Sequence, residues 1–326
     1  MANRPSEDDL IARFFAPIAG PEGLGLRDDA ALLTPRSGSD IVLTKDALVA
    51  GVHFFADDPP AAIARKALRV NLSDLAAKGA EPVGFLLALA LPGDWTANWL
   101  GAFAHGLGED AATYRCPLFG GDTVKTPGPL MVSITALGRV TSGRMVARAG
   151  VKPGDVLYVS GTIGDAALGL KLRLGGGPPL GAVHRDFLLD RYLLPQPRQK
   201  LAPVLGEFAH GGMDVSDGFV GDLTKMLRVS GVSAQVDLAK LPLSAAAHAA
   251  IALDPALFAI AATGGDDYEI LASVAPQNAA VFEAEAGDAD VRVTLVGQAL
   301  AGDGLPRFLG RDGAGIAFER GAFSHF

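Results

Sequence analysis

Aspartates recur in this sequence at the ends of apolar segments, beside glycine, serine or threonine. They are Asp28, Asp29, Asp46, Asp74, Asp122, Asp214 and Asp217. A short carboxylate that the backbone holds at the end of a strand is a rigid oxygen ligand, which suits Mg²⁺. A dication would also relieve the repulsion between the adjacent carboxylates of Asp28 and Asp29. Each aspartate alone is equally typical of a turn or a helix cap, but the set together predicts a site for divalent cations.

The strand expected over residues 41–49 gives two of these oxygens a common direction. Side chains alternate between the two faces of a strand. Thr44 and Asp46 therefore point to one side of this strand, and Lys45 points to the other. This alternation predicts that a hydroxyl and a carboxylate enter the cation site together while the lysine stays outside it.

The helix expected over residues 60–78 carries a polar face. Asn71, Asp74 and Lys78 fall at i, i+3 and i+7 among alanine, leucine and valine residues, and this spacing puts them on one side of the helix. The face either looks onto a cleft or lies in solvent, and both readings fit the periodicity.

No segment matches a common phosphate-binding or nucleophile motif. GDAALGLK (164–171) resembles a P-loop, but Leu170 separates the second glycine from Lys171 and no Ser or Thr follows the lysine. The preceding SGTIGD segment leads into a helix whose N-terminus is able to hold an anion. Cys116 lies among apolar residues, and no triad or zinc spacing is present. We therefore expect no covalent nucleophile.

Composition restricts the class of protein. The chain has 326 residues, 49% of them hydrophobic and 20% charged, with a net charge of −8. This balance is typical of a folded globular protein and argues against nucleic-acid binding. No apolar run reaches the roughly 18 residues of a membrane-spanning helix, and MANRPSEDDL does not resemble a signal peptide. With a single cysteine, these features predict a cytoplasmic protein.

Helices and strands are expected to be mixed without regular alternation. The patterns predict helices over 6–19, 60–78 and 95–114, strands over 41–49, 83–91 and 130–140, and a strand that ends at the glycines of PLFGGD. A turn at 151–155 predicts two lobes, residues 1–150 and 151–326. The fold class expected is therefore α+β or mixed α/β in two lobes.

Taken in order, the motifs identify a resemblance that covers essentially the whole chain. RDDAALL, TKDALVAGVHF, NLSDLAAKGAEP, FGGDT, ARAGVKPGD, SGTIGDAALGL, DVSDG, TGGDDYE and the final SHF resemble the thiamine-monophosphate kinase family. That family belongs to the superfamily of aminoimidazole ribonucleotide synthetase, selenophosphate synthetase and a hydrogenase-maturation protein. The resemblance implies ATP-dependent phosphorylation of thiamine monophosphate to thiamine diphosphate, several Mg²⁺ ions, and a homodimer whose N-terminal, ATP-binding lobes pair in a barrel-like core.

The same resemblance implies roles for individual residues. Metal ligands would be Asp29, Thr44, Asp46, Asp74, Asp122, Asp214 and Asp217, with Asp28 as a further partner. Nucleotide contacts would be Gly121, Asp122, Arg148 and Ser216. Substrate contacts would be His53, Asp266 and the aromatic Phe323, with Phe318 as its alternative.

Three positions depart from the family pattern: Arg27 stands for the usual glycine, Lys45 for threonine and Asp266 for glutamate. We expect Lys45 to point away from the metal site and Arg27 to pair with Asp28 or to reach a ligand phosphate. Two alternatives stay open at this point. One is another enzyme of the superfamily, in particular the purine-pathway synthetase. The other is a catalytically silent protein that binds Mg²⁺ and nucleotide.

Overall fold

The computed structural model describes residues 6–318. The chain divides into two compact units, Met1–Leu75 with Glu81–Gly143, and Ala76–Ala80 with Arg144–Phe326. The first unit ends at Gly143, shortly before the predicted lobe limit at residue 150. The assignment of separate functions to the two lobes stays a prediction.

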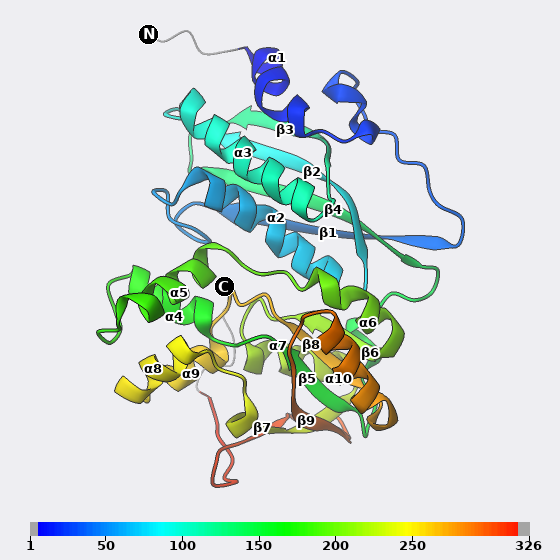
Figure 1. Ribbon diagram of the computed structural model, residues 1–326, viewed down its shortest axis with the longest axis vertical. Helices are drawn as coiled ribbons and strands as arrows, with labels where there is room; N and C mark the ends of the chain where they lie inside the picture. The colour runs from blue at the N-terminus through cyan, green and yellow to red at the C-terminus, as the bar shows by residue number, and fades with distance from the viewer. Residues whose placement is uncertain (1–5, 319–326) are drawn as a thin grey trace. The chain divides into compact units, whose positions relative to one another are not determined.

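A four-stranded sheet forms the centre of the first unit. Its strand order is β1 (Ser39–Val49), β4 (Met131–Thr141), β2 (Glu81–Leu91) and β3 (Leu118–Lys125). β4 runs antiparallel to both of its neighbours, whereas β2 and β3 are parallel. A parallel pair needs a long crossover connection, and helix α3 (Ala97–Thr113) supplies it. Helices α2 (Pro60–Ala77) and α3 cover one face of the sheet (Figure 1).

The two faces of this sheet differ in burial. On the helix-covered face, Leu48 and Ile134 are buried. On the opposite face, Leu43, Leu86 and Val124 are 65%, 40% and 50% exposed. Side chains alternate along each strand, so the same alternation that fills the core leaves an apolar second face that α2 and α3 do not cover.

The N-terminal helix and the third strand depart from expectation. The predicted helix over 6–19 is irregular: α1 (Glu7–Leu10) continues as a π-helical turn, Ile11–Phe15, and a 3₁₀ turn, Ala16–Ile18. Ser6 caps it as predicted, since the amide of Asp9 donates to Ser6 Oγ at 3.2 Å. The expectation that a strand ends at FGGD is wrong. β3 continues to Lys125, because its backbone pairs with β2 along that length.

The second unit is built on a six-stranded sheet. Its order is β10 (Arg307–Leu309), β7 (Val232–Asp237), β9 (Val293–Ala301), β5 (Val156–Ser160), β8 (Ile270–Val274) and β6 (Ala209–Asp214). Only the β10–β7 pair is parallel among the pairs in this sheet. Its helices are α4 (Asp165–Arg173), α5 (Ala182–Leu193), α6 (Ala202–Phe208), α7 (Phe219–Ser230), α8 (Ala245–Leu253), α9 (Leu257–Thr263) and α10 (Ala279–Asp288).

Helix α7 shows how the second unit buries its core. Phe219, Leu223, Met226 and Leu227 are spaced at i, i+4, i+7 and i+8 and are buried, which is the apolar stripe of a helix packed on a sheet. The predicted α+β class with mixed sheets is confirmed. Across residues 6–318, no helix is both long and apolar enough to span a bilayer.

Candidate functional site

Three oxygen-bearing side chains meet between β1 and α2. Thr44 Oγ1 donates a short hydrogen bond to Asp74 Oδ2. Burial, together with the nearby charge of Asp74, raises the pKa of Asp46 to about 6. All three side chains are half-buried. The predicted common direction of Thr44 and Asp46 is confirmed, and the polar face of the helix meets a strand, not open solvent, at Asp74.

Two neighbours define the character of this cluster. Lys45 Nζ donates to Ser133 Oγ at 2.9 Å, on the opposite face of the strand, so the prediction that its side chain points away is confirmed. Asn71, one turn before Asp74, is fully buried. Its Nδ2 donates to the carbonyl of Ala67 at 3.0 Å, while its Oδ1 has no hydrogen-bond partner among residues 6–318. A buried amide oxygen without a donor is costly, and it leaves an oxygen available to a cation or to water.

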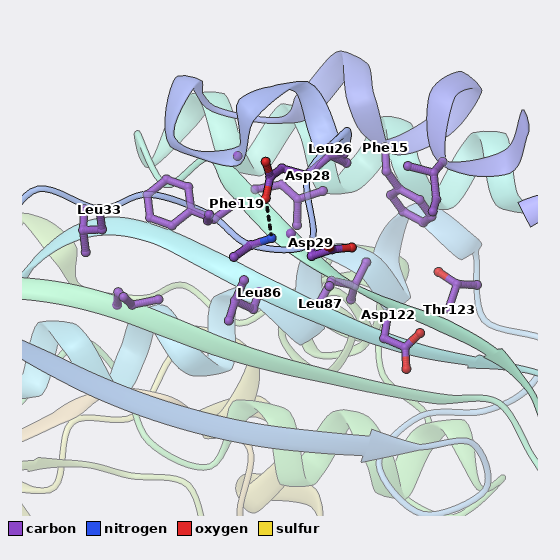
Figure 2. A pocket seen from close by; sticks show the side chains of 18 residues that line it. Phe15, Leu26, Asp28, Asp29, Leu33, Leu86, Leu87, Phe119, Asp122 and Thr123 are labelled. Atoms are coloured by element: carbon purple, nitrogen blue, oxygen red, sulfur yellow. Dashed lines mark hydrogen bonds between the residues drawn. The ribbon is translucent and has the colours of Figure 1, made fainter. Parts of the chain in front are cut away.

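A pocket of about 580 Å³ lies over the edge of the sheet (Figure 2). Asp28 and Asp29 line it from the N-terminal loop, and Gly121 and Asp122 line it from β3. Most of the remaining wall is apolar, including Phe119. The pocket therefore combines three exposed carboxylates with an apolar surface, an arrangement that suits a partly apolar ligand with an attached polyphosphate and its counter-ions.

Strand register separates this pocket from the Thr44 cluster. Asp46 pairs with Ile134 and Ile134 pairs with Leu87, which in turn pairs with Gly121. Cross-strand partners point to the same face, so Asp122, one residue further on, points to the opposite face from Asp46. A Cβ at Gly121 would overlap the carbonyl oxygen of Leu87, which explains why only glycine fits there.

The loop that carries the predicted metal ligand Asp29 also contains Arg27. Arg27 is exposed and forms no ion pair within residues 6–318. Of its two expected partners, Asp28 is not in contact with it: Asp28 Oδ1 accepts a hydrogen bond from the amide of Ala30 at 3.3 Å. That contact closes a local turn of the kind aspartate favours. Contact of Arg27 with a ligand phosphate stays a prediction.

His53 lies in the turn after β1 with its ring held in one tautomer. The amide of Val49 donates to His53 Nδ1 at 3.0 Å, so Nδ1 is an acceptor and the neutral ring carries its proton on Nε2. The buried ammonium of Lys66 donates to the carbonyl of His53 at 3.0 Å. These two contacts fix the position of His53 at the end of the strand.

In the second unit, the DVSDG segment (214–218) links β6 to α7. Asp214 is buried at the strand end. Asp217 accepts from Lys225 Nζ at 2.5 Å, and its own amide donates to Asp222 Oδ2 at 2.8 Å. Lys225 also donates to Asp222 Oδ1 at 2.9 Å. Asp217 was predicted to bind a metal; in the structure it is neutralised by an ammonium.

Asp222 is the buried member of that group. Its side chain is 1% exposed. Burial raises its pKa, and the hydrogen bonds from Lys225 and the Asp217 amide oppose the rise. Lys225 is one residue that our reading of the sequence missed. The i, i+3 spacing of Asp222 and Lys225 is the signal that would have found the pair.

The segment TGGDDYE (263–269) brings Asp266 beside DVSDG. The amide of Asp266 donates to the carbonyl of Ser216 at 2.9 Å, so these predicted substrate and nucleotide residues are neighbours. Asp266 Oδ1 accepts from the Tyr268 hydroxyl at 3.4 Å. Arg148, the other predicted nucleotide contact of this unit, is exposed in a 3₁₀ turn.

The N-terminus of α4 is occupied by the protein itself. The amides of Gly164 and Ala166 donate to Asp267 at 2.7 and 3.3 Å. The expectation that SGTIGD could hold an anion is therefore met by an internal carboxylate. Asp267 lies 103 residues from Gly164 in sequence, and no local pattern points to it.

The two aromatic candidates for substrate contact differ in status. Phe323 lies outside the described residues. Phe318 packs edge-on against Phe308, with ring centroids 6.0 Å apart, beside the core of the second unit. Phe318 therefore has a structural role in the core, which requires no contact with a ligand.

The predicted metal ligands therefore fall into several groups. Within residues 6–318, no three His, Cys, Asp or Glu side chains gather as a preformed metal site. The chemistry of the Thr44, Asp46 and Asp74 group nevertheless fits Mg²⁺. All its donors are oxygens, its carboxylates repel each other, and the oxygen of nearby Asn71 has no partner.

Comparisons with known proteins agree along the whole chain. Residues 27–140 match the model of the AIR synthase related protein N-terminal domain, and residues 152–308 match that of the C-terminal domain. The thiamine-monophosphate kinase of Caulobacter vibrioides is 44% identical over 315 residues, covering 94% of this chain and 88% of the relative.

Solved structures give the same result. The crystal structure of thiamine-monophosphate kinase from Stenotrophomonas maltophilia K279a is 37% identical, with a TM-score of 0.81, and covers 89% of this chain and 91% of its own. A complex described as AaThiL with AMPPCP and TMP is 30% identical, with a TM-score of 0.79, and covers 92% of this chain and 91% of its own.

Proposed function

This chain belongs to the thiamine-monophosphate kinase family of AIR synthase related proteins, and from that membership we propose how its residues act. It transfers the terminal phosphoryl group of ATP to thiamine monophosphate and releases thiamine diphosphate and ADP. The observation that carries the assignment is the near-complete alignment with thiamine-monophosphate kinases. A structural relative was determined with AMPPCP and TMP together.

The acceptor in this reaction is a phosphate oxygen, largely ionised near neutral pH, so the chain need not supply a strong general base. The barrier lies in bringing two anions together and holding them in line. In the first unit, His53 is our candidate for orienting the acceptor phosphate. The pocket lined by Gly121 and Asp122 provides a place for the nucleotide.

The proposed reaction also requires divalent cations. Thr44, Asp46 and Asp74 would hold Mg²⁺ in the first unit, and Asp28, Asp29 and Asp122 would offer separate carboxylate ligands in the pocket at the edge of the sheet. Within the second unit, Asp214 is a further proposed ligand. Bound there, Mg²⁺ neutralises phosphate charge and aligns the reacting oxygens. Asp217 would act as a ligand in the second unit only if its contact with Lys225 were broken.

Transfer is direct, without a phosphoenzyme. Cys116 is fully buried, and burial raises the pKa of its thiol to about 12, so it is not an activated nucleophile. Rapid quenching of a single turnover with labelled ATP should recover label only in ATP and thiamine diphosphate. Acid- or base-stable label on the protein would contradict direct transfer.

The deciding experiment measures ADP formation with ATP, Mg²⁺ and thiamine monophosphate, and identifies thiamine diphosphate by mass. Turnover only with a purine-pathway formylglycinamidine would assign the chain to the synthetase instead. The alternative of a catalytically silent protein has less support, because Lys45 contacts Ser133 and not the carboxylates. Absence of turnover with every acceptor would restore that alternative.

The open face of the first-unit sheet suits pairing between two copies of the chain. Leu43, Leu86 and Val124 leave an apolar surface there, and burying it would gain about 25 cal/mol per Å² of apolar area. Light scattering should give twice the 33.5 kDa chain mass. Leu43→Arg with Leu86→Glu should give monomers. Leu253→Arg, at an exposed leucine of α8, should leave the dimer intact.

Because its donor is ATP, the enzyme is placed in the cytoplasm. The single cysteine is compatible with that reducing compartment.

A further inference from the structure

The loop 264–268 holds a backbone conformation that its residue types disfavour. Asp266 has φ of 74° and Tyr268 has φ of 52°, which is the left-handed region. A residue with a Cβ loses free energy there and persists only where its surroundings fix it. Aspartate tolerates this region better than most residues, whereas tyrosine is disfavoured in it. Two left-handed residues around one position indicate a loop that is actively held.

Backbone contacts hold one side of the loop. The amide of Asp266 donates to Ser216 at 2.9 Å and that of Tyr268 donates to Val215 at 2.8 Å. In return, the amide of Val215 donates to the carbonyl of Glu269 at 2.7 Å. A Cβ at Gly265 would overlap the carbonyl oxygen of Ser216, so the two segments approach as closely as glycine permits. Loop 264–268 and the DVSDG segment are therefore held together by their backbones.

Side-chain contacts hold the end of the loop that follows Asp266. Asp267 accepts amides from the first turn of α4, as described above. Glu269, 5% exposed, accepts from Arg198 Nε and from Ser160 Oγ, each at 2.6 Å. A carboxylate at a helix N-terminus and a two-point arginine contact are both strong, directional anchors. They flank the loop at the residues just after Asp266.

We propose that Asp267 is a positioning residue that fixes Asp266 for contact with thiamine monophosphate. The proposal rests on the function argued above. Asp267 itself does not touch the substrate. It ties the loop to the start of α4, so that Asp266 keeps its left-handed backbone and its side chain keeps one direction. The shorter reach of Asp266, compared with the glutamate of the family pattern, makes such fixing more important.

Three variants test the proposal. Asp267→Ala removes both amide contacts, and Asp267→Asn retains one acceptor oxygen. Asp237→Ala is the control, because Asp237 also caps a short helix of this unit by accepting the Ala239 amide at 3.0 Å. We expect Asp267→Ala to raise the KM for thiamine monophosphate about tenfold, since small misplacements of positioning groups cost one to two orders of magnitude. The KM for ATP should change less than about twofold.

Hydrogen exchange supplies a readout that does not depend on turnover. Amides of 264–268 should exchange faster in Asp267→Ala, less so in Asp267→Asn, and unchanged in the control. If the alanine variant does not fold, the asparagine variant decides by the same two readouts. Faster exchange with an unchanged KM would overturn the positioning role alone, and so would unchanged exchange. A wild-type protein that forms no ADP with thiamine monophosphate would overturn the proposed function instead.

Discussion

The predicted ligand carboxylates of the first unit and the anchoring carboxylates of the second unit differ in their partners. In the first unit, the predicted ligands Asp28, Asp29, Asp46, Asp74 and Asp122 form no ion pair with any lysine, arginine or histidine within residues 6–318. Asp46 and Asp74 even lie close enough to repel each other. A protein that buries paired acids without a cation of its own is prepared for cations from solution.

In the second unit, acids are engaged by the protein itself. Asp222 contacts Lys225, and Glu269 contacts Arg198. Asp267 caps a helix. These carboxylates hold segments together instead of waiting for a ligand. The difference teaches that an aspartate in a motif is not by itself a ligand. An internal partner, either a cation or the amides of a helix N-terminus, marks the carboxylates that have a structural role.

The largest expected effect comes from removing a first-unit carboxylate. Asp46→Asn deletes a predicted Mg²⁺ ligand and should lower kcat/KM by about a hundredfold or more. The same change removes repulsion with Asp74, so thermal stability should rise. Asp40→Asn is the matched control on the same strand. Its exposed carboxylate contacts only Ser142 and Gly143 at the far end, and its activity should be unchanged. Loss of both activity and stability in Asp46→Asn would contradict the comparison.

A second-unit cation should matter for stability. Lys225→Met leaves the buried Asp222 carboxylate without its ammonium, and breaking a buried pair in this way costs about 3 kcal/mol. Urea denaturation should show the loss. Lys240→Met is the control, since Lys240 is 56% exposed and lies 3.8 Å from Asp237. Exposed pairs of that kind contribute about 0–1 kcal/mol. Equal effects of the two substitutions would remove the distinction between the units.

The pH dependence of stability offers a smaller test of the same contrast. The pKa of Asp46 is raised to about 6 in the folded protein from 3.8. Folding therefore favours the protonated acid, and the contribution of Asp46 is fully present below pH 4. It is lost as pH rises through 6, by about 3 kcal/mol. Wild type should show this loss between pH 4 and 7, and Asp46→Asn should not. Mg²⁺ should restore more stability at pH 7.5 than at pH 5, where protons compete. A pH-independent difference between the two proteins would contradict this.

Where position is decided by local periodicity, the sequence was a sufficient guide. The strand expected over 41–49 is observed at Ser39–Val49. Its alternation correctly put Thr44 and Asp46 on one side and Lys45 on the other, because the faces of a strand follow from its geometry alone. The two-lobed mixed class was likewise readable from the irregular order of helical and strand patterns.

The sequence was not a sufficient guide where the position of a residue depends on contacts between distant segments. The apolar spacing of residues 6–19 fits one continuous helix, but Pro17 has no amide to donate, and the helix passes through π and 3₁₀ turns instead. β3 continues through Gly120 and Gly121 because β2 supplies its hydrogen bonds. The cap of α4 by Asp267 joins residues far apart in sequence. Register also separates Asp122 from Asp46, which a shared residue type cannot reveal.

The smallest expected effect falls on Arg27, the residue that departs most from the family pattern. Its guanidinium is exposed and has no partner in the part of the chain that is described, so Arg27→Gly should change stability by no more than about 0.5 kcal/mol. Calorimetric affinities for ATP and Mg²⁺ should change less than about twofold. Arg148→Gly, at a predicted nucleotide contact, should weaken ATP binding about tenfold, because an arginine–phosphate contact is charge-assisted. A tenfold loss in Arg27→Gly would mean that this loop folds onto the bound nucleotide. The first unit would then contribute a cation of its own to a site where its described residues provide only acids.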